Sequence, residues 1–204
     1  SMALPRPVKD LRVENVTIVP PGEKRPTVAG VGFAVAAGQA LGIIGPSGSG
    51  KSTLSRILTG AWTPAGGKVR IDGASFDQWD REALGRHIGY LPQGVELFDG
   101  TIAENIARFE DNADPNAIIA AAQAAGAHEL ILRFEKGYDS NIGEAGSSLS
   151  AGQRQRIGLA RALYGEPFLV VLDEPNANLD AEGEAAVVRA MASVRDRKGI
   201  VVVI

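Results

Sequence analysis

The stretch GPSGSGKS at residues 45–52 decides the fold, and it follows the apolar run ALGII at residues 40–44. It matches G-x-x-x-x-G-K-[ST], and STLSRILTGAW at residues 52–62 continues it with helical periodicity. A strand, a glycine-rich loop and a helix in this order predict a phosphate-binding loop, because glycines let backbone N–H groups at a helix start point at phosphate oxygens. The alternative is a glycine-rich turn with no ligand.

The lysine and serine that end this motif have predicted roles of their own. We expect Lys51 to reach the β- and γ-phosphates and the Ser52 hydroxyl to ligate Mg²⁺. The residues expected to bind the nucleotide here are Gly45, Pro46, Ser47, Gly48, Ser49, Gly50, Lys51, Ser52 and Thr53.

A pair of carboxylates follows the apolar stretch FLVVL at residues 168–172, which predicts a buried strand. Ligands of open α/β sheets bind at the carboxyl ends of the strands. We therefore expect Asp173 to hold Mg²⁺, through water, and Glu174 to polarise the attacking water. Acidic pairs after a strand also serve as helix caps, although Pro175 directly after this pair makes a cap less natural.

The stretch LSAGQ at residues 149–153 predicts a second helix start, with Ser150 as N-cap and Gln153 completing a capping box. The same residues make an anion site from free N–H groups, a small hydroxyl and Gly152. This site lies far along the chain from Lys51, so one nucleotide could touch two helix starts, including starts on different subunits.

Strands and helices alternate along the chain, which predicts an α/β fold with a mostly parallel sheet covered on both faces. We expect the catalytic core at residues 41–93 and 159–204, an antiparallel β part at 3–40, and an inserted helical subdomain at 94–158. Helix starts are predicted at Asp114-Pro115 and at Asp180.

Composition excludes several classes of function. The 204 residues carry a net charge of −3, which argues against broad electrostatic binding of nucleic acid, and the absence of cysteine excludes disulfides and cysteine metal sites. The apolar runs are all shorter than the ~20 residues that a membrane span needs.

The motifs together resemble the ATP-binding cassettes of ABC transporters. LSAGQ-RQR is similar to their LSGGQ signature, Gln93 in YLPQ to their Q-loop, and Asn178-Leu179-Asp180 to their D-loop. The resemblance covers essentially the whole chain, and it implies a P-loop NTPase core of the RecA-like kind and an ATPase that uses ATP and Mg²⁺.

The resemblance also implies a partner and further site residues. Two cassettes would form a head-to-tail dimer with two ATPs between them, so that the Lys51 loop of one faces Ser150, Gly152 and Gln153 of the other. Gln93 would sense Mg²⁺ and water and couple to the membrane domain, and Asp180 would signal across the dimer.

Other stretches resemble ABC exporters, and among these the type I secretion exporters of the protease- and adhesin-secreting kind. They include VTIVPPGEKRP at 16–26, VELFDGTIAENI at 95–106, the loop IGEAG at 142–146, and ALYGEPFLVVLDEPNANLD at 162–180. The resemblance implies a transmembrane domain in the same transporter, a polypeptide cargo, envelope secretion partners and a place at the cytoplasmic face of the bacterial inner membrane.

The sequence departs from the family pattern in three places. No aromatic residue stands near Val19-Pro20 to stack on adenine, Ala151 replaces a glycine of the signature, and Ile204 ends the chain one or two residues before the expected switch histidine. We therefore expect a chain cut short at its C-terminus that hydrolyses ATP poorly, and we interpret Ser1-Met2 as a cloning remnant.

Two alternatives compete with the exporter. A soluble, non-transport ABC ATPase acting in DNA repair or on ribosomes is disfavoured, since no heptad run for an inserted coiled coil appears. A regulatory nucleotide-binding module without turnover is disfavoured by Glu174. Packing or surface roles are expected for the remaining histidines and tryptophans, which are His87, His128, Trp62 and Trp79.

Overall fold

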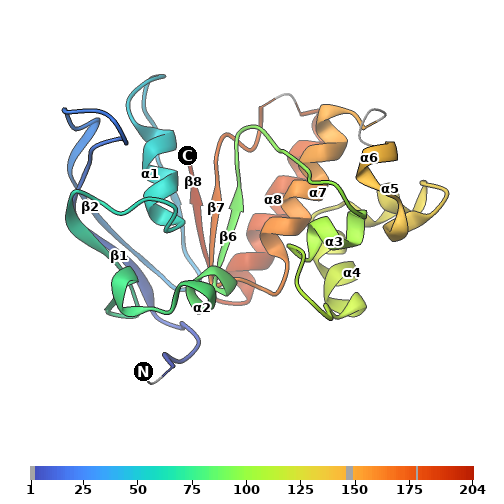
Figure 1. The fold of residues 1–204 in the computed structure, drawn as a ribbon, viewed down its shortest axis with the longest axis horizontal. Helices are drawn as coiled ribbons and strands as arrows, with labels where there is room; N and C mark the ends of the chain where they lie inside the picture. Colours follow the sequence, from blue (N-terminus) through green and yellow to red (C-terminus); the bar gives the residue numbers. More distant parts are fainter. Residues whose placement is uncertain (1–2, 146–148, 178) are drawn as a thin grey trace.

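The computed structural model describes residues 3–145, 149–177 and 179–204 (Figure 1). Its strands are β1 (Asp10–Ile18), β2 (Val28–Ala36), β3 (Ala40–Gly42), β4 (Gly66–Ile71), β5 (Ala74–Ser75), β6 (Ile88–Leu91), β7 (Leu169–Leu172) and β8 (Ile200–Val203). Its helices are α1 (Lys51–Leu58), α2 (Arg81–Arg86), α3 (Ile102–Ile106), α4 (Pro115–Ala124), α5 (His128–Leu132), α6 (Ile142–Ala145), α7 (Ala151–Leu163) and α8 (Ala181–Asp196).

The central sheet is parallel, with strand order β3-β8-β7-β6. Every residue of β7 is buried, because alternate side chains enter cores on opposite faces of the sheet. Leu169 and Val171 pack in the core that contains α1, whereas Val170 and Leu172 pack in the core that contains α7 and α8. This two-sided burial confirms the α/β fold class and explains why the strand is apolar throughout.

A second sheet is antiparallel, with order β2-β1-β4-β5. It extends beyond the expected range 3–40, because β4 and β5 come from the segment expected in the catalytic core. Gly67 allows β4 to approach β1 closely: it has a φ of +76°, and a Cβ there would lie 2.2 Å from the carbonyl oxygen of Glu14. Long-range pairing of this kind leaves no mark in the local sequence.

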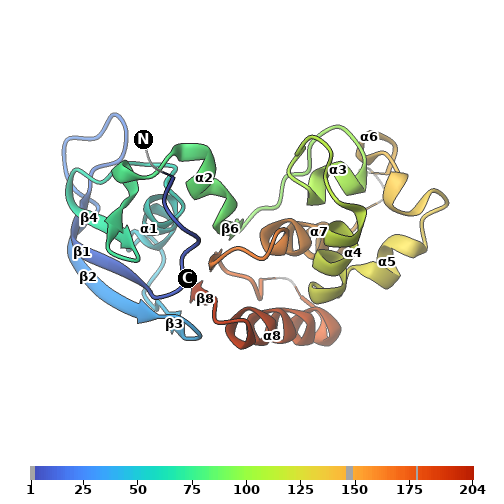
Figure 2. The same ribbon diagram turned by 90° about the horizontal axis from the view of Figure 1, so that it is seen from below.

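The helical subdomain packs on the far side of the parallel sheet from α1 (Figure 2). The alanine-rich run at residues 118–134 forms two helices, because α4 ends at the C-cap Ala125 and Gly126 takes a φ of +67°. The predicted N-cap Asp114 accepts a hydrogen bond from the Asn116 backbone N–H, with Pro115 in the first turn.

The predicted packing roles of the four remaining aromatic and histidine side chains agree with their contacts. The ring centroids of His87 and buried Trp79 lie 5.7 Å apart in an edge-on arrangement. His128 Nδ1 lies 2.7 Å from the Tyr138 hydroxyl oxygen. The Arg56 guanidinium lies 4.7 Å from the ring of Trp62.

Three features of the predicted site share one side of the molecule. The loop before α1, the carboxyl end of β8 and the first turn of α7 all lie toward the top of Figure 1. The fold therefore directs two helix N-termini and the strand ends to the same surface.

Candidate functional site

The loop at residues 45–50 has the backbone that its glycines predict. Gly48 and Gly50 have φ values of +80° and +88°, and a Cβ on Gly50 would lie 2.5 Å from Val28 Cγ2. Gly50 is also the N-cap of α1, so the helix begins at Lys51 with its free N–H groups facing the loop. The Lys51 ammonium donates to the carbonyl oxygens of Gly45 and Pro46, which places a positive charge inside the curve of the loop.

Asp173 lies at the carboxyl end of β7 and is 3% exposed. Burial raises the pKa of its carboxyl group, the charge of Glu174 raises it further, and hydrogen bonds from Ser55, Ser52 and Tyr90 oppose both effects. One carboxylate oxygen, Oδ2, lies 3.4 Å from the Ser55 hydroxyl. The other, Oδ1, is buried and has no hydrogen-bond partner among the residues that the structure describes.

The unpartnered buried oxygen of Asp173, whose carboxyl group the Ser52 hydroxyl also contacts, fits Mg²⁺, which takes oxygen ligands and keeps several of its waters. The described part of the chain holds no group of three or more His, Cys, Asp or Glu side chains that could bind a metal alone. A metal at Asp173 and Ser52 would therefore take its remaining ligands from phosphate and water, as Mg²⁺ does in nucleotide sites.

Glu174 and Gln93 meet across 81 positions of sequence, since Gln93 Nε2 donates to Glu174 Oε2 at 2.8 Å. Both residues are exposed. Glu174 has a φ of +45°, and its N–H donates to the Ile204 carbonyl at 2.8 Å. A residue other than glycine keeps a positive φ only where the surrounding structure holds it there. The hydrogen bonds of Glu174 with the Gln93 amide and with the Ile204 carbonyl therefore orient its carboxylate.

The second helix start is built as predicted. Ser150 is the N-cap of α7, its hydroxyl accepts from the Gln153 N–H at 3.1 Å, and Gln153 Oε1 accepts from the Ser150 N–H at 2.9 Å. Ala151 is the first residue of the helix and therefore has helical dihedral angles. The alanine thus fits without backbone strain.

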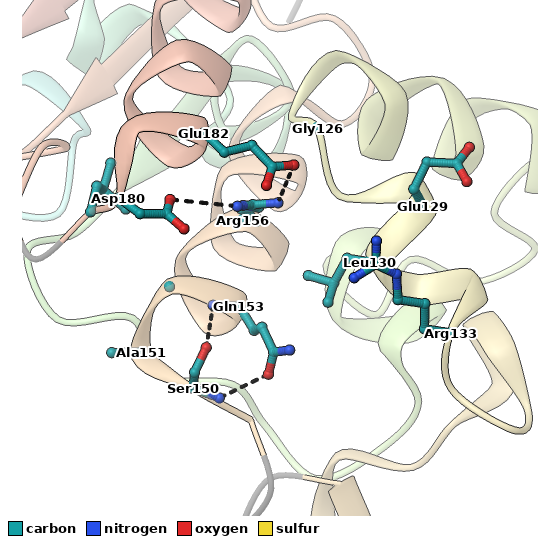
Figure 3. A pocket seen from close by; sticks show the side chains of 12 residues that line it. Gly126, Glu129, Leu130, Arg133, Ser150, Ala151, Gln153, Arg156, Asp180 and Glu182 are labelled. Carbon is teal, nitrogen blue, oxygen red and sulfur yellow. Dashed lines mark hydrogen bonds and ion pairs between the residues drawn. The ribbon is translucent and has the colours of Figure 1, made fainter.

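A cleft of about 490 Å³ opens beside this helix start (Figure 3). Residues 150–153 and Arg156 form one wall, and residues from Gly126 to Arg133 face them across the cleft. Arg156 joins α7 to the start of α8, with Asp180 Oδ1 at 3.7 Å and Glu182 Oε1 at 3.3 Å. None of residues 45–53 lines this cleft, so the loop before α1 and the start of α7 are separate features of the chain.

Some predicted residues lie outside the described residues, namely Gly146 and Asn178. Asp180, the described end of the same motif, is the N-cap of α8 and accepts from the Gly183 N–H at 2.8 Å.

Sequence reasoning missed several residues that hold the site together. Gln155 Nε2 donates to the carbonyl of Pro175, which ties α7 to the segment after Glu174. Ser55 and Tyr90 surround Asp173, and Arg156 binds the start of α8. Ser55 alone left a local signal, because it is a polar residue on the apolar face of α1.

A glycine-rich phosphate loop, an acidic pair at a strand end and a second capped helix start define a P-loop ATPase with a signature helix. The chain belongs to the ABC transporter family, whose profile matches residues 28–177. It is an ATP-binding ATPase domain of that family.

Several known proteins resemble this chain. It is 59% identical over 203 residues to the type I secretion system ATP-binding protein PrsD of Rhizobium meliloti, covering 100% of this chain and 35% of PrsD. It is 40% identical over 173 residues to the cyclolysin secretion/processing ATP-binding protein CyaB of Bordetella pertussis, covering 85% of this chain and 24% of CyaB. The chain thus spans about a third or less of the length of these relatives.

A solved structure of a bacterial Atm1-family ABC exporter with ATP bound superposes with a TM-score of 0.86 at 34% identity. The match covers 99% of this chain and 35% of that one. Within the described residues, no helix is both long and apolar enough to cross a bilayer.

Proposed function

We propose that this chain is the ATP-hydrolysing domain that drives a type I secretion exporter. The observation that carries the proposal is the 59% identity to PrsD along the whole chain, and the placement of the loop before α1 and the start of α7 toward the same side of the molecule supports it. The rest of such an exporter would include a transmembrane domain, placing this domain at the cytoplasmic face of the bacterial inner membrane. The cargo would be a polypeptide that passes to partners in the cell envelope.

In the proposed cis half-site, residues 45–53 bind the ATP phosphates through backbone N–H groups and the Lys51 ammonium. Mg²⁺ held by Ser52 and Asp173 would neutralise charge on the β- and γ-phosphates. Glu174 orients and deprotonates the attacking water, and Gln93 holds Glu174 in place until nucleotide contacts compete for its amide.

In the proposed trans half-site, Ser150, Gly152 and Gln153 of a second copy meet the nucleotide bound by the first. The cleft at the start of α7 is open to solvent and carries free helix N–H groups, which suits a phosphate brought by another subunit. Asp180 borders the same cleft and would report the occupied state to the partner. Closure of two such copies would move the attached membrane domains.

The catalytic assignment is tested with Glu174→Gln in the full-length transporter reconstituted in membranes. We expect phosphate release to fall at least ~100-fold, since general base catalysis contributes about 10²–10⁴-fold, while ATP affinity stays within about twofold. Glu135→Gln, at an exposed glutamate of the helical subdomain, is the matched control and keeps wild-type turnover. Wild-type turnover in Glu174→Gln would remove Glu174 from the mechanism.

The two-subunit site has its own test. Glu174→Gln should form an ATP-dependent dimer in light scattering, and adding Ser150→Ala should abolish that dimer without changing ATP binding by the monomer. A dimer that survives Ser150→Ala would contradict the trans assignment. The exporter role is checked in cells, where full-length Glu174→Gln should retain its polypeptide cargo inside; unchanged secretion would contradict it.

A further inference from the structure

Ser55 is a fully buried hydroxyl on an otherwise apolar helix face. It is 0% exposed, and its buried neighbours on α1 are Leu54, Ile57 and Leu58. A buried hydroxyl without hydrogen bonds destabilises a fold, so a serine persists in such a place only where it has partners. The partners of Ser55 therefore indicate what the residue does.

The Ser55 hydroxyl touches three groups from three elements. Its Oγ lies 2.6 Å from the Ser52 carbonyl oxygen on α1, 3.3 Å from the Tyr90 hydroxyl on β6, and 3.4 Å from Asp173 Oδ2 after β7. Tyr90 pairs directly with Val171, two residues before Asp173. The hydroxyls of Ser55 and Tyr90 thus join the phosphate-loop helix to the strand end that carries the acidic pair.

The environment of the Asp173 carboxylate is asymmetric. Oδ2 faces the Ser55 hydroxyl, whereas Oδ1 is buried and has no partner within the described ranges. Hydroxyls on one side fix the rotation of a carboxylate and leave the other oxygen free for a ligand.

We propose that Ser55 and Tyr90 are positioning residues for Mg²⁺, holding Asp173 so that Oδ1 faces the metal or a water bound to it. The single Ser55 hydroxyl proton is shared between Asp173 Oδ2 and the Ser52 carbonyl oxygen, so one hydroxyl links the two proposed ligand residues. The inference rests on the proposed role of Ser52 and Asp173 in binding Mg²⁺.

The test compares nucleotide binding with and without metal in the 204-residue chain. Binding of a fluorescent ATP analogue, mant-ATP, is titrated in EDTA and in Mg²⁺, and Mn²⁺ bound with the nucleotide is counted by electron paramagnetic resonance. Loss of a side chain that orients a metal ligand typically lowers metal affinity 10–100-fold. Because the Ser55–Asp173 contact is 3.4 Å long, we expect about tenfold weaker Mn²⁺ and Mg²⁺ affinity in Ser55→Ala.

Tyr90→Phe is the second variant, because it removes one hydroxyl and keeps the partly buried ring. We expect a smaller loss of metal affinity in the same direction, of about threefold, and unchanged mant-ATP binding in EDTA for both variants. Two controls remove hydroxyls of the same kinds elsewhere. Thr59→Ala removes a hydroxyl that donates to the Arg56 carbonyl at 3.3 Å, and Tyr138→Phe one that contacts His128; both should leave metal affinity unchanged.

Each other outcome has one meaning. If mant-ATP binding is weakened equally with and without Mg²⁺, Ser55 and Tyr90 only support the fold. If both variants keep wild-type metal affinity, the two residues do not position Asp173. Either result overturns this inference and leaves the proposed metal site standing. Wild-type protein whose nucleotide binding ignores Mg²⁺ and that binds no Mn²⁺ would instead overturn the proposed metal site, and this inference with it.

Discussion

Arg108 joins the helical subdomain to the catalytic core, and its replacement by alanine should destabilise the whole domain. Its guanidinium donates to the carbonyls of Arg161 at 3.1 Å, Gly85 at 3.1 Å and Ile88 at 3.0 Å, with Ala162 at 3.5 Å. These carbonyls lie near the C-terminal ends of α2 and α7 and at the start of β6. Carbonyls in a last helical turn lack their usual partner one turn further on, and the guanidinium donates to those of Gly85, Arg161 and Ala162.

The size of the effect follows from these contacts. Hydrogen bonds to a charged group contribute about 1.5–3 kcal/mol each, and three of the four have donor–acceptor distances of 3.0–3.1 Å. Burial of the cation opposes this gain, and the pKa of Arg108 is lowered first by that burial and then by the charge of Arg161. We therefore expect Arg108→Ala to lower the free energy of unfolding by about 3 kcal/mol, or Tm by roughly 6–12 °C for a domain of this size.

Guanidinium chloride unfolding, followed by the fluorescence of Trp62 and Trp79, measures the change. Arg70→Ala is the matched control, because Arg70 forms a surface pair with Glu14 at 3.2 Å and such pairs contribute about 0–1 kcal/mol. Arg108→Lys should fall between the wild type and Arg108→Ala, since one ammonium group cannot reach all the carbonyls. A loss in Arg108→Ala no larger than in Arg70→Ala would refute the reasoning.

Three further outcomes are expected. Gly50→Ala should weaken mant-ATP binding at least about tenfold, because the alanine would have to adopt a positive φ and its Cβ would lie 2.5 Å from Val28 Cγ2. Wild-type affinity in this variant would contradict the prediction. Gly89→Ala should lower the free energy of unfolding by more than about 3 kcal/mol, measured by chemical denaturation, since its Cβ would lie 1.8 Å from the Ala162 carbonyl oxygen. Asp173→Asn should raise Tm at pH 7, because burial raises the pKa of the Asp173 carboxyl group above 3.8 and an ionised Asp173 therefore destabilises the fold. The difference in Tm between variant and wild type should shrink as the pH falls through the folded-state pKa toward 3.8. A difference that grows instead would contradict the raised pKa of Asp173.

Local spacing was enough to predict the backbone of the loop at residues 45–52, the strand end that carries the acidic pair, and the capped helix at Ser150. Each is made by neighbouring residues, whose order alone sets a positive φ at Gly50, the end of a strand at Asp173, or a capping box with Gln153. The apolar stretch at residues 168–172 likewise required a strand buried on both faces.

Only the tertiary structure decided which distant residues meet. The Gln93–Glu174 hydrogen bond, the Ser55–Asp173 contact and the Arg108 interactions each join elements that are far apart in sequence, so no periodicity could place them. The same holds for β4, which joins the antiparallel sheet because its apolar side chains find their core there and Gly67 permits the approach. The sequence by itself determined which secondary structure each short segment forms. Packing between segments determined how they assemble into a site, because the free energy of burial depends on neighbours that the chain brings together only on folding.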